Sequence, residues 1–265
     1  MSYQVSRISS SDDTTVDRGK RPEAQHQHVH VHHHNEPTAE DLQRVLTPGG
    51  HWIDYSQTPL PPAHRKHGNP APLGLLSFGT GFFMASAFTL NVRGVHVPNM
   101  VVPVLIFFGG IMQLGVGLWE MFTGSTFGAT VFSAYGSFNL TYAGIFLPAL
   151  GVIDAYVGPD GKIDDQFDQA VAIYLFAWMM VSLVFLVGAL RTNAAIISTL
   201  VCASVAFCFF AIHSMNASNG ARIAGSAFGI GAAACAWWAA LSGFWTRDST
   251  FTWVRVNPID LSRKD

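Results

Sequence analysis

Charged side chains are almost absent from the long central part of the chain, between Leu73 and Trp245. Six apolar stretches of about 20 residues follow one another there, and almost none contains Lys, Arg, Asp or Glu in its interior. A helix of roughly 20 apolar residues is long enough to cross the hydrocarbon core of a bilayer, which is about 30 Å thick. The sequence therefore predicts an all-α membrane protein with six transmembrane helices.

The composition of the whole chain agrees with this prediction. Only 12% of its 265 residues are charged, whereas a soluble domain carries about 25%. The predicted spans cover residues 72–92, 99–122, 128–150, 170–190, 195–214 and 223–245. They make up one permease-like membrane domain, 69–246, between two polar tails.

The two tails, residues 1–68 and 247–265, are predicted to be cytoplasmic. Basic residues near span ends favour the cytoplasmic side of a membrane, and more of them lie on the side of the tails: Arg65, Lys66, Arg191, Arg247 and Arg255, against Arg93, Lys162 and Arg222. Residues 1–68 contain few aliphatic side chains, which is typical of disorder. The tail also contains a tract of histidines between His26 and His34, which suggests either metal binding or a pH response, or a low-complexity tail without such a role. No metal site is predicted.

The sequence contains no signature of catalysis. It has no P-loop, no Gly-x-Ser-x-Gly and no paired histidines with a glutamate. No run of basic residues indicates a nucleic-acid partner. We expect no enzyme activity, no cofactor and no nucleic-acid binding.

Polar residues inside the predicted spans are the first candidates for function, because they usually face a bundle interior or a water path. The second span contains Gln113 and Glu120. In the third span, Tyr135, Asn139 and Tyr142 follow one another at spacings of four and three residues, which places them near one helical face. This face is predicted to line a pore, although interhelical hydrogen bonding is the alternative.

The start of the first span is a candidate anion site. Asn69 is a good helix N-cap, and Pro70 and Pro72 are tolerated in a first turn. The N–H groups of Leu73 and its successors are then expected to point freely out of the helix start, where they could bind an anion. A plain helix start is the alternative.

Three segments resemble those of a known family. The run Asn69-Pro-Ala-Pro-Leu-Gly-Leu75 is similar to the signature of the acetate uptake (acetate/succinate permease) family of bacteria and fungi. Ser125-Thr-Phe-Gly128 and Ser133-Ala-Tyr-Gly-Ser-Phe138 resemble its second and third landmarks. The resemblance extends from about Asn69 to Trp253, and the long N-terminal tail resembles that of fungal members.

The resemblance implies a homo-hexameric ring with an hourglass pore through each protomer. It further implies a hydrophobic constriction near the middle of the membrane, formed by a Phe, a Tyr and a Leu. The Phe and the Tyr correspond to Phe78 and Tyr135. The Leu corresponds to Ala203, counted back from Ala211-Ile212, and this smaller side chain predicts a looser constriction.

The expected function is transport of acetate and related short-chain carboxylates, including succinate, across the plasma membrane. The spans contain no Lys or Arg to hold a carboxylate, and an unpaired anion in hydrocarbon is very unfavourable. The substrate is therefore expected to cross with a proton or as the neutral acid, as through a carboxylate channel with an apolar gate. Glu120 is a candidate for proton exchange or an interfacial structural residue. The alternatives are ammonium or ammonia export, and an acid or nutrient sensor that transports nothing.

Overall fold

The computed structural model describes residues 68–246 and 249–262, and these residues form helices and their connections. The long helices are α2 (Ala71–Thr89), α5 (Thr126–Ile145), α6 (Gln166–Ala189), α7 (Ala194–Asn216) and α8 (Asn219–Phe244). Between α2 and α5, one continuous helical segment consists of α3 (Val101–Pro103), the π-helix η3 (Val104–Met112) and α4 (Gln113–Phe122). Short 3-10 turns lie in the connections, at Val92–Gly94, Pro98–Met100, Pro148–Leu150 and Asp154–Tyr156. The all-α class predicted from the sequence is confirmed. The histidine tract and most of the N-terminal tail lie outside the described residues.

Five helices of the described chain are long and apolar enough to cross a membrane. They are Ala71–Thr89, Pro98–Phe122, Gln166–Ala189, Ala194–Asn216 and Asn219–Phe244. The helix α5 has 20 residues and no charged side chain, but it is rich in hydroxyl groups. The helix α5 is long enough to cross a membrane, but its hydroxyl groups distinguish it from the five helices named above.

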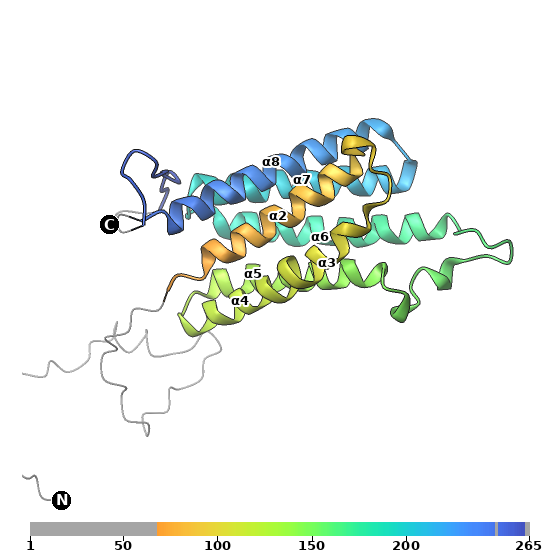
Figure 1. The fold of residues 1–265 in the computed structure, drawn as a ribbon, viewed down its shortest axis with the longest axis horizontal. Helices are drawn as coiled ribbons and strands as arrows, with labels where there is room; N and C mark the ends of the chain where they lie inside the picture. Colours follow the sequence, from red (N-terminus) through yellow and green to blue (C-terminus); the bar gives the residue numbers. More distant parts are fainter. Residues whose placement is uncertain (1–67, 247–248, 263–265) are drawn as a thin grey trace, which may run out of the picture. The chain divides into compact units, whose positions relative to one another are not determined.

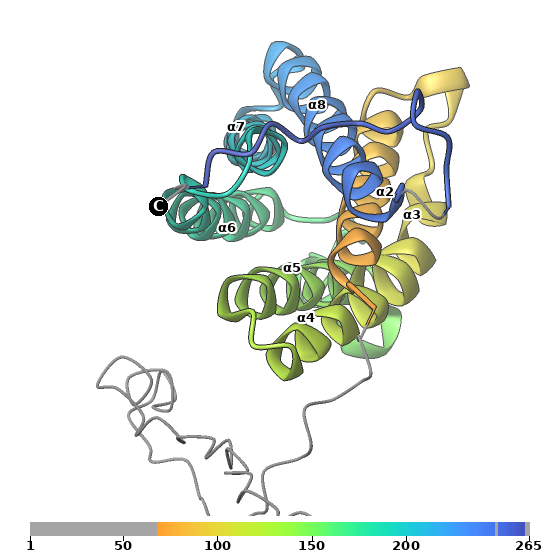
Figure 2. The same ribbon diagram turned by 90° about the vertical axis from the view of Figure 1, so that its left-hand side faces the viewer.

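The helices lie alongside one another with their axes along the bundle (Figure 1). Seen from the end, α6, α7 and α8 occupy one side and α4 and α5 the other, while α2 lies between α8 and the α3–α4 segment (Figure 2). The backbones of α5 and α6 approach each other little. Large side chains fill the space between them, with the ring centroids of Phe138 and Trp178 5.0 Å apart.

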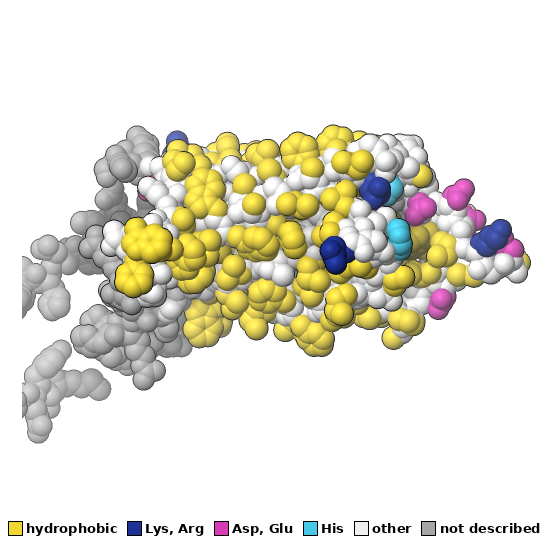
Figure 3. Space-filling view, turned by 45° about the horizontal axis from the view of Figure 1, so that its top comes forward, with side chains coloured by type: hydrophobic (Ala, Val, Ile, Leu, Met, Phe, Trp, Pro, Cys, Tyr) yellow, Lys and Arg dark blue, Asp and Glu magenta, His cyan; other side chains and the backbone are white. Residues whose placement is uncertain are grey.

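We call the two ends of the bundle the N-terminal end and the loop end. The N-terminal end contains the start of α2, the α4–α5 and α6–α7 connections and the end of α8. The loop end contains the α2–α3, α5–α6 and α7–α8 connections (Figure 1). Hydrophobic side chains cover the middle of the visible face, and charged side chains and histidines gather at the loop end (Figure 3). This distribution suits a molecule surrounded by hydrocarbon.

Several predicted boundaries were wrong, for identifiable reasons. The third span was predicted to reach residue 150, but α5 ends at Ile145, just before a 3-10 turn that begins at Pro148. Proline lacks the N–H that would continue a helix. The fourth span was predicted from residue 170, whereas α6 begins at Gln166 and includes Asp168 in its first turn. A carboxylate there is favourable to the helix dipole.

The first span also ends earlier than predicted, at Thr89 rather than residue 92. The Arg222 guanidinium donates a hydrogen bond to the Thr89 carbonyl at 2.6 Å. This cation satisfies one of the carbonyls that a helix end leaves free. Asn91 follows in the left-handed region with φ of 54°, which turns the chain away.

Small residues allow the helices around α8 to pack closely. Ala232, Ala233, Ala236 and Ala240 of α8 are fully buried. On α2, a Cβ atom added at Gly79 would lie 2.7 Å from Nε1 of Trp237. Helices in membranes associate through such close contacts, because lipid gives them no hydrophobic driving force to associate.

The C-terminal segment packs against the start of α7 (Figure 2). The Ala194 N–H donates to the Ile259 carbonyl at 3.0 Å, and the Leu261 N–H donates to the Thr192 carbonyl at 3.0 Å. The Trp238 indole N–H donates to the Asn257 carbonyl at 3.0 Å. These bonds satisfy polar groups at the N-terminal end and hold the segment on the bundle.

Candidate functional site: an aromatic waist between two cavities

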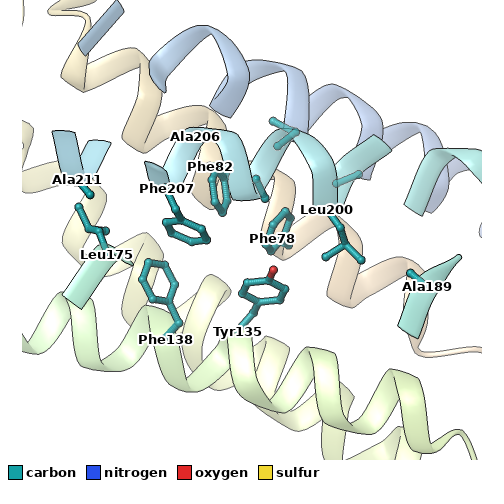
Figure 4. Packing of buried hydrophobic residues seen from close by; sticks show 14 of the residues in the cluster. Phe78, Phe82, Tyr135, Phe138, Leu175, Ala189, Leu200, Ala206, Phe207 and Ala211 are labelled. Carbon is teal, nitrogen blue, oxygen red and sulfur yellow. The ribbon is translucent and has the colours of Figure 1, made fainter. Parts of the chain in front are cut away.

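A cluster of large side chains crosses the middle of the bundle. The ring centroid of Phe78 lies 4.9 Å from that of Tyr135 and 4.7 Å from that of Phe82. Phe207 lies 5.3 Å from Phe82 and 5.1 Å from Phe138. All five side chains are buried, and Figure 4 shows them facing one another from α2, α5 and α7. We call these five residues the aromatic waist.

Helical spacing brings the waist together. Phe78 and Phe82 are four residues apart on α2, and Tyr135 and Phe138 are three apart on α5, so each pair shares a helix face. On α7, Leu200 and Phe207 are seven residues apart and also share a face. Sequence reasoning identified Phe78 and Tyr135 but missed Phe82, Phe138 and Phe207. Their spacing was the signal that could have found them.

Two cavities flank the waist and share no lining residue. The first, of about 160 Å³, lies toward the N-terminal end and is lined by Ala71, Leu75, Phe78, Gln113, Glu120, Ser125, Phe127, Gly128, Val131, Phe132, Tyr135, Ile196, Thr199 and Leu200. We call it the N-side cavity. The second, of about 320 Å³, is the loop-side cavity, and its walls include Phe82, Phe138 and Phe207. The waist therefore separates two cavities that open from opposite halves of the bundle.

The Tyr135 phenol is held by α6 rather than free in a cavity. Its hydroxyl donates to Oγ of Ser182 at 2.8 Å, and Ser182 donates in turn to the Trp178 carbonyl at 2.8 Å. The Tyr135 ring lies 5.6 Å from that of Phe185. These contacts fix the ring orientation, so Tyr135 presents its apolar ring toward Phe78.

A pair of amide side chains links the two cavities. Nδ2 of Asn139 donates to the Gly109 carbonyl at 2.8 Å and to Oε1 of Gln113 at 3.2 Å. Asn139 lines the loop-side cavity and Gln113 lines the N-side cavity. Gln113 is fully buried, and among the described residues its Nε2 has no hydrogen-bond partner. A buried donor without a partner is costly unless a ligand or water satisfies it.

The start of α2 differs from the prediction. Oδ1 of Asn69 accepts from the Ala71 N–H at 3.0 Å, so the side chain does satisfy a first-turn donor. However, the N–H groups of Leu73 and Gly74 both donate to the Pro70 carbonyl, at 3.1 and 3.3 Å. The expectation that the first-turn N–H groups are free was therefore wrong. The N-cap of α2 is Pro70 rather than Asn69: Pro70 has backbone angles in the helical region, and its carbonyl accepts these donors.

Glu120 lies in the wall of the N-side cavity and is only 5% exposed. It packs against Gly128 of α5, where an added Cβ atom would lie 2.6 Å from the Glu120 Oε2 atom. Within the described part of the chain, no hydrogen bond or ion pair holds its carboxylate. Glu120 thus places a buried carboxyl group in the wall of the N-side cavity.

Leu200, rather than Ala203, lines the N-side cavity. Ala203 is fully buried in the core and is absent from the walls of both cavities. Figure 4 places Leu200 beside Phe78. The predicted pore residues Phe78, Tyr135, Gln113 and Glu120 meet at the N-side cavity, and Asn139 and Tyr142 meet at the loop-side cavity. Asn69, Pro70 and Ala203 line neither.

The polar side chains of the loop-side cavity come from helix segments near the loop end of the bundle. They include Thr89, Tyr142, Asp168, His213 and Ser214. Among the described residues, no group of three His, Cys, Asp or Glu side chains could hold a metal ion. The cavity therefore offers hydrogen bonds and three titratable side chains, Tyr142, Asp168 and His213, close to an apolar waist.

Apolar helices, an apolar outer face and internal cavities define a multi-pass helical membrane protein. The chain belongs to the GPR1/FUN34/yaaH family, which matches residues 54–263. This match confirms the resemblance seen in the signature that begins at Asn69.

Individual relatives carry different names. Ammonia transport outward protein 2 of Saccharomyces cerevisiae is 31% identical over 204 residues, which are 77% of this chain and 70% of that protein. Acetate permease A of Emericella nidulans is 30% identical over 198 residues, 72% of this chain and 66% of that protein. The succinate-acetate/proton symporter SatP of Escherichia coli is 35% identical over 159 residues, 60% of this chain and 78% of that protein.

A solved structure has a similar fold. The bacterial acetate channel SatP superimposes with a TM-score of 0.62 and 28% sequence identity, covering 72% of this chain and all of that chain.

Proposed function

We propose that this protein is a plasma-membrane permease for acetate and related short-chain carboxylates. The observation that carries the proposal is the aromatic waist between two cavities, in a chain whose relatives include acetate permease A and the SatP symporter. We further propose that α5 is a sixth span, so that the pore runs through one protomer along α5. An enzyme activity is not part of this proposal.

The waist supports passage without net charge. A bare carboxylate among five aromatic rings would lose its hydration with no cation to replace it, and burial of an unpaired ion costs several kcal/mol or more. The neutral acid loses much less. An apolar constriction of this kind can also lose its water and so block small ions. We therefore propose that the acid crosses as the neutral molecule or together with a proton.

Polar side chains on either side of the waist are proposed to guide the carboxyl group. Nε2 of Gln113 is a buried donor that can reach a carboxyl oxygen in the N-side cavity. Asn139 and Tyr142 offer hydrogen bonds on the other side. Glu120 is the proposed proton-exchange group. Asn69 and Pro70 shape the helix start next to Ala71, at the edge of the N-side cavity.

We propose that the protein assembles as a homo-hexamer with both tails in the cytoplasm. Large hydrophobic side chains remain exposed on the isolated protomer, including Phe107, Ile173, Val184 and Val187. Lipid and neighbouring protomers together can cover such a surface.

The direct test is uptake of labelled acetate into liposomes that contain the purified full chain. We expect uptake above that of protein-free liposomes, which are the necessary background because undissociated acetic acid also crosses lipid unaided. Unlabelled acetate in excess should compete, and other short carboxylates should compete more weakly or equally. A chain that binds acetate but adds nothing to this background would be a sensor rather than a permease.

Ammonia export is the second candidate, since two relatives are named ammonia transport outward proteins. A waist that excludes ions in favour of neutral molecules would suit ammonia as well as a neutral acid. Release of ammonia from the same liposomes, measured by the internal pH, separates the two candidates. Ammonia flux without acetate uptake would favour the second.

A further inference from the structure

The loop-side cavity contains a histidine, His213, for which the transport route described above has no role. We propose that His213 is the capture site for the carboxyl group of the substrate, and that the pair of His213 and the acid shares one proton. This inference rests on the proposed function, because it assigns the residue through which a carboxylic acid enters the cavity. The cavity volume of about 320 Å³ lies at the lower end of the range of small-molecule sites.

The hydrogen bonds of His213 determine which ring nitrogen carries the proton. Nδ1 lies 3.1 Å from the Ser218 carbonyl oxygen. A carbonyl can only accept a hydrogen bond, so Nδ1 carries the N–H in the neutral ring. Within the described residues, Nε2 has no hydrogen-bond partner. The neutral side chain therefore presents Nε2 as an acceptor, and the protonated one presents it as a donor.

An acceptor at Nε2 matches an undissociated carboxylic acid. The acid O–H donates to Nε2, and transfer of that proton gives an imidazolium that donates to the carboxylate. Both forms contain the same atoms and the same single hydrogen bond, and only the position of the proton differs. Two other combinations fit poorly. A carboxylate beside a neutral imidazole lacks the shared proton, and an undissociated acid beside an imidazolium carries one proton too many.

The charges around His213 favour the same pairing. Asp168 of α6 lines the cavity. Its carboxylate repels a bare carboxylate, but it does not repel a neutral acid or a carboxylate paired with imidazolium. From α5 the titratable side chain is Tyr142, and α2 contributes the neutral Thr89. From α8, Arg222 donates hydrogen bonds to the Thr89 carbonyl and to Oδ1 of Asn219, and it is not among the residues that line the cavity.

The remaining walls suit a short acid. Val171, Leu175 and Phe210 line the same cavity and give it an apolar part. A methyl group or short chain can pack there while the carboxyl group meets Nε2. The acid would then reach the waist already accompanied by its proton.

Equilibrium binding of labelled acetate to the purified full chain, measured from pH 5 to pH 8.5, tests the proposal. At pH values where neither His213 nor acetate holds the shared proton, wild-type affinity should fall about tenfold for each further pH unit. The variants are His213→Asn, whose amide can replace the Nδ1 bond to Ser218, and His213→Gln, whose amide replaces Nε2. The matched control is His96→Gln, an exposed histidine in the α2–α3 connection.

Both His213 variants should lose the break at which the wild-type affinity begins to fall, and His96→Gln should keep it. Because the two variants preserve different halves of the ring's hydrogen bonding, a shared change reports the titration and not a local distortion. If both variants keep the wild-type profile while acetate is bound and transported, the inference is overturned and the proposed function stands. If the wild type neither binds nor transports acetate, the proposed function itself fails.

Discussion

At the scale of single residues, Tyr135 shows how a polar group is accommodated in the apolar centre of the bundle. Its hydroxyl donates to Ser182, which in turn donates to the Trp178 carbonyl. The order of donors makes the two ends of this chain unequal. Loss of the Tyr135 hydroxyl leaves Ser182 satisfied, whereas loss of the Ser182 hydroxyl leaves a buried phenol without an acceptor.

We therefore predict that Ser182→Ala destabilises the protein more than Tyr135→Phe. The phenylalanine variant should lose about 1 kcal/mol, the net contribution of one hydrogen bond, and the alanine variant about 1–3 kcal/mol. Thermal unfolding in detergent measures the order, and the double variant should resemble Tyr135→Phe. A lower melting temperature for Tyr135→Phe than for Ser182→Ala would contradict this account of the bond.

Two neighbouring positions on α7 test which aliphatic side chain sets the size of the constriction. Leu200 lines the N-side cavity, whereas Ala203 is fully buried and lines neither cavity. Leu200→Ala should raise uptake of lactate and succinate relative to acetate, because it widens the wall next to Phe78. Ala203→Leu should cost about 1–3 kcal/mol of stability by overpacking and leave the ratio of the acids unchanged.

Relative uptake of the three acids, normalised to the amount of folded protein, decides between the positions. If Ala203→Leu suppresses succinate and lactate more than acetate, Ala203 faces the pore as the sequence comparison implies. The structure and the sequence thus make opposite predictions for one substitution.

At the scale of elements, the π-helix η3 is the feature that brings the amide pair together. Its nine residues include Gly109, whose carbonyl accepts from Asn139. A Cβ atom at position 109 would lie 2.9 Å from Nδ2 of Asn139. π-helical turns are often found at functional sites, and here the turn lies between the two cavities.

We predict that Gly109→Ala lowers acetate uptake by displacing Asn139 from Gly109 and Gln113. The control is Gly115→Ala on α4, where an added Cβ atom would meet nothing within 4 Å in the protomer. The control should be neutral or stabilising by up to about 1 kcal/mol, since alanine favours helix over glycine. Equal uptake by the two variants would remove the amide pair from the transport route.

Individual elements also show what the sequence could and could not predict. Hydropathy predicted the ends of the long helices to within a few residues. Charged side chains are very unfavourable in the lipid interior, so they are rare within the spans and mark the span ends. It did not predict η3, because the π-helical register depends on packing against α5. Nor did it predict that Pro70 already has helical angles, which removes the free N–H groups expected of Leu73 and Gly74. Phe78 and Tyr135 were predicted from the family resemblance. Leu200 was not predicted, because the sequence does not fix which face of α7 turns toward the cavity.

At the scale of the whole molecule, the basic residues predict the orientation in the membrane. Arg191 and Arg255 belong to the N-terminal end, and Lys162 belongs to the loop end with several aspartates. We predict that the loop end is extracellular. In a variant without Cys202, Cys208 and Cys235, a cysteine in place of Lys162 should react with an impermeant thiol reagent on intact cells. Reaction only after permeabilisation would reverse the orientation.

The central claim is that the acid passes the aromatic waist without net charge. It is tested most directly by acetate uptake into liposomes in which the pH gradient and the membrane potential are set independently. An inward proton gradient should accelerate the protein-dependent uptake at zero potential. A potential of either sign should leave the uptake unchanged at equal pH. Uptake that follows an inside-positive potential without a pH gradient would mean that the bare anion crosses, and would contradict the account.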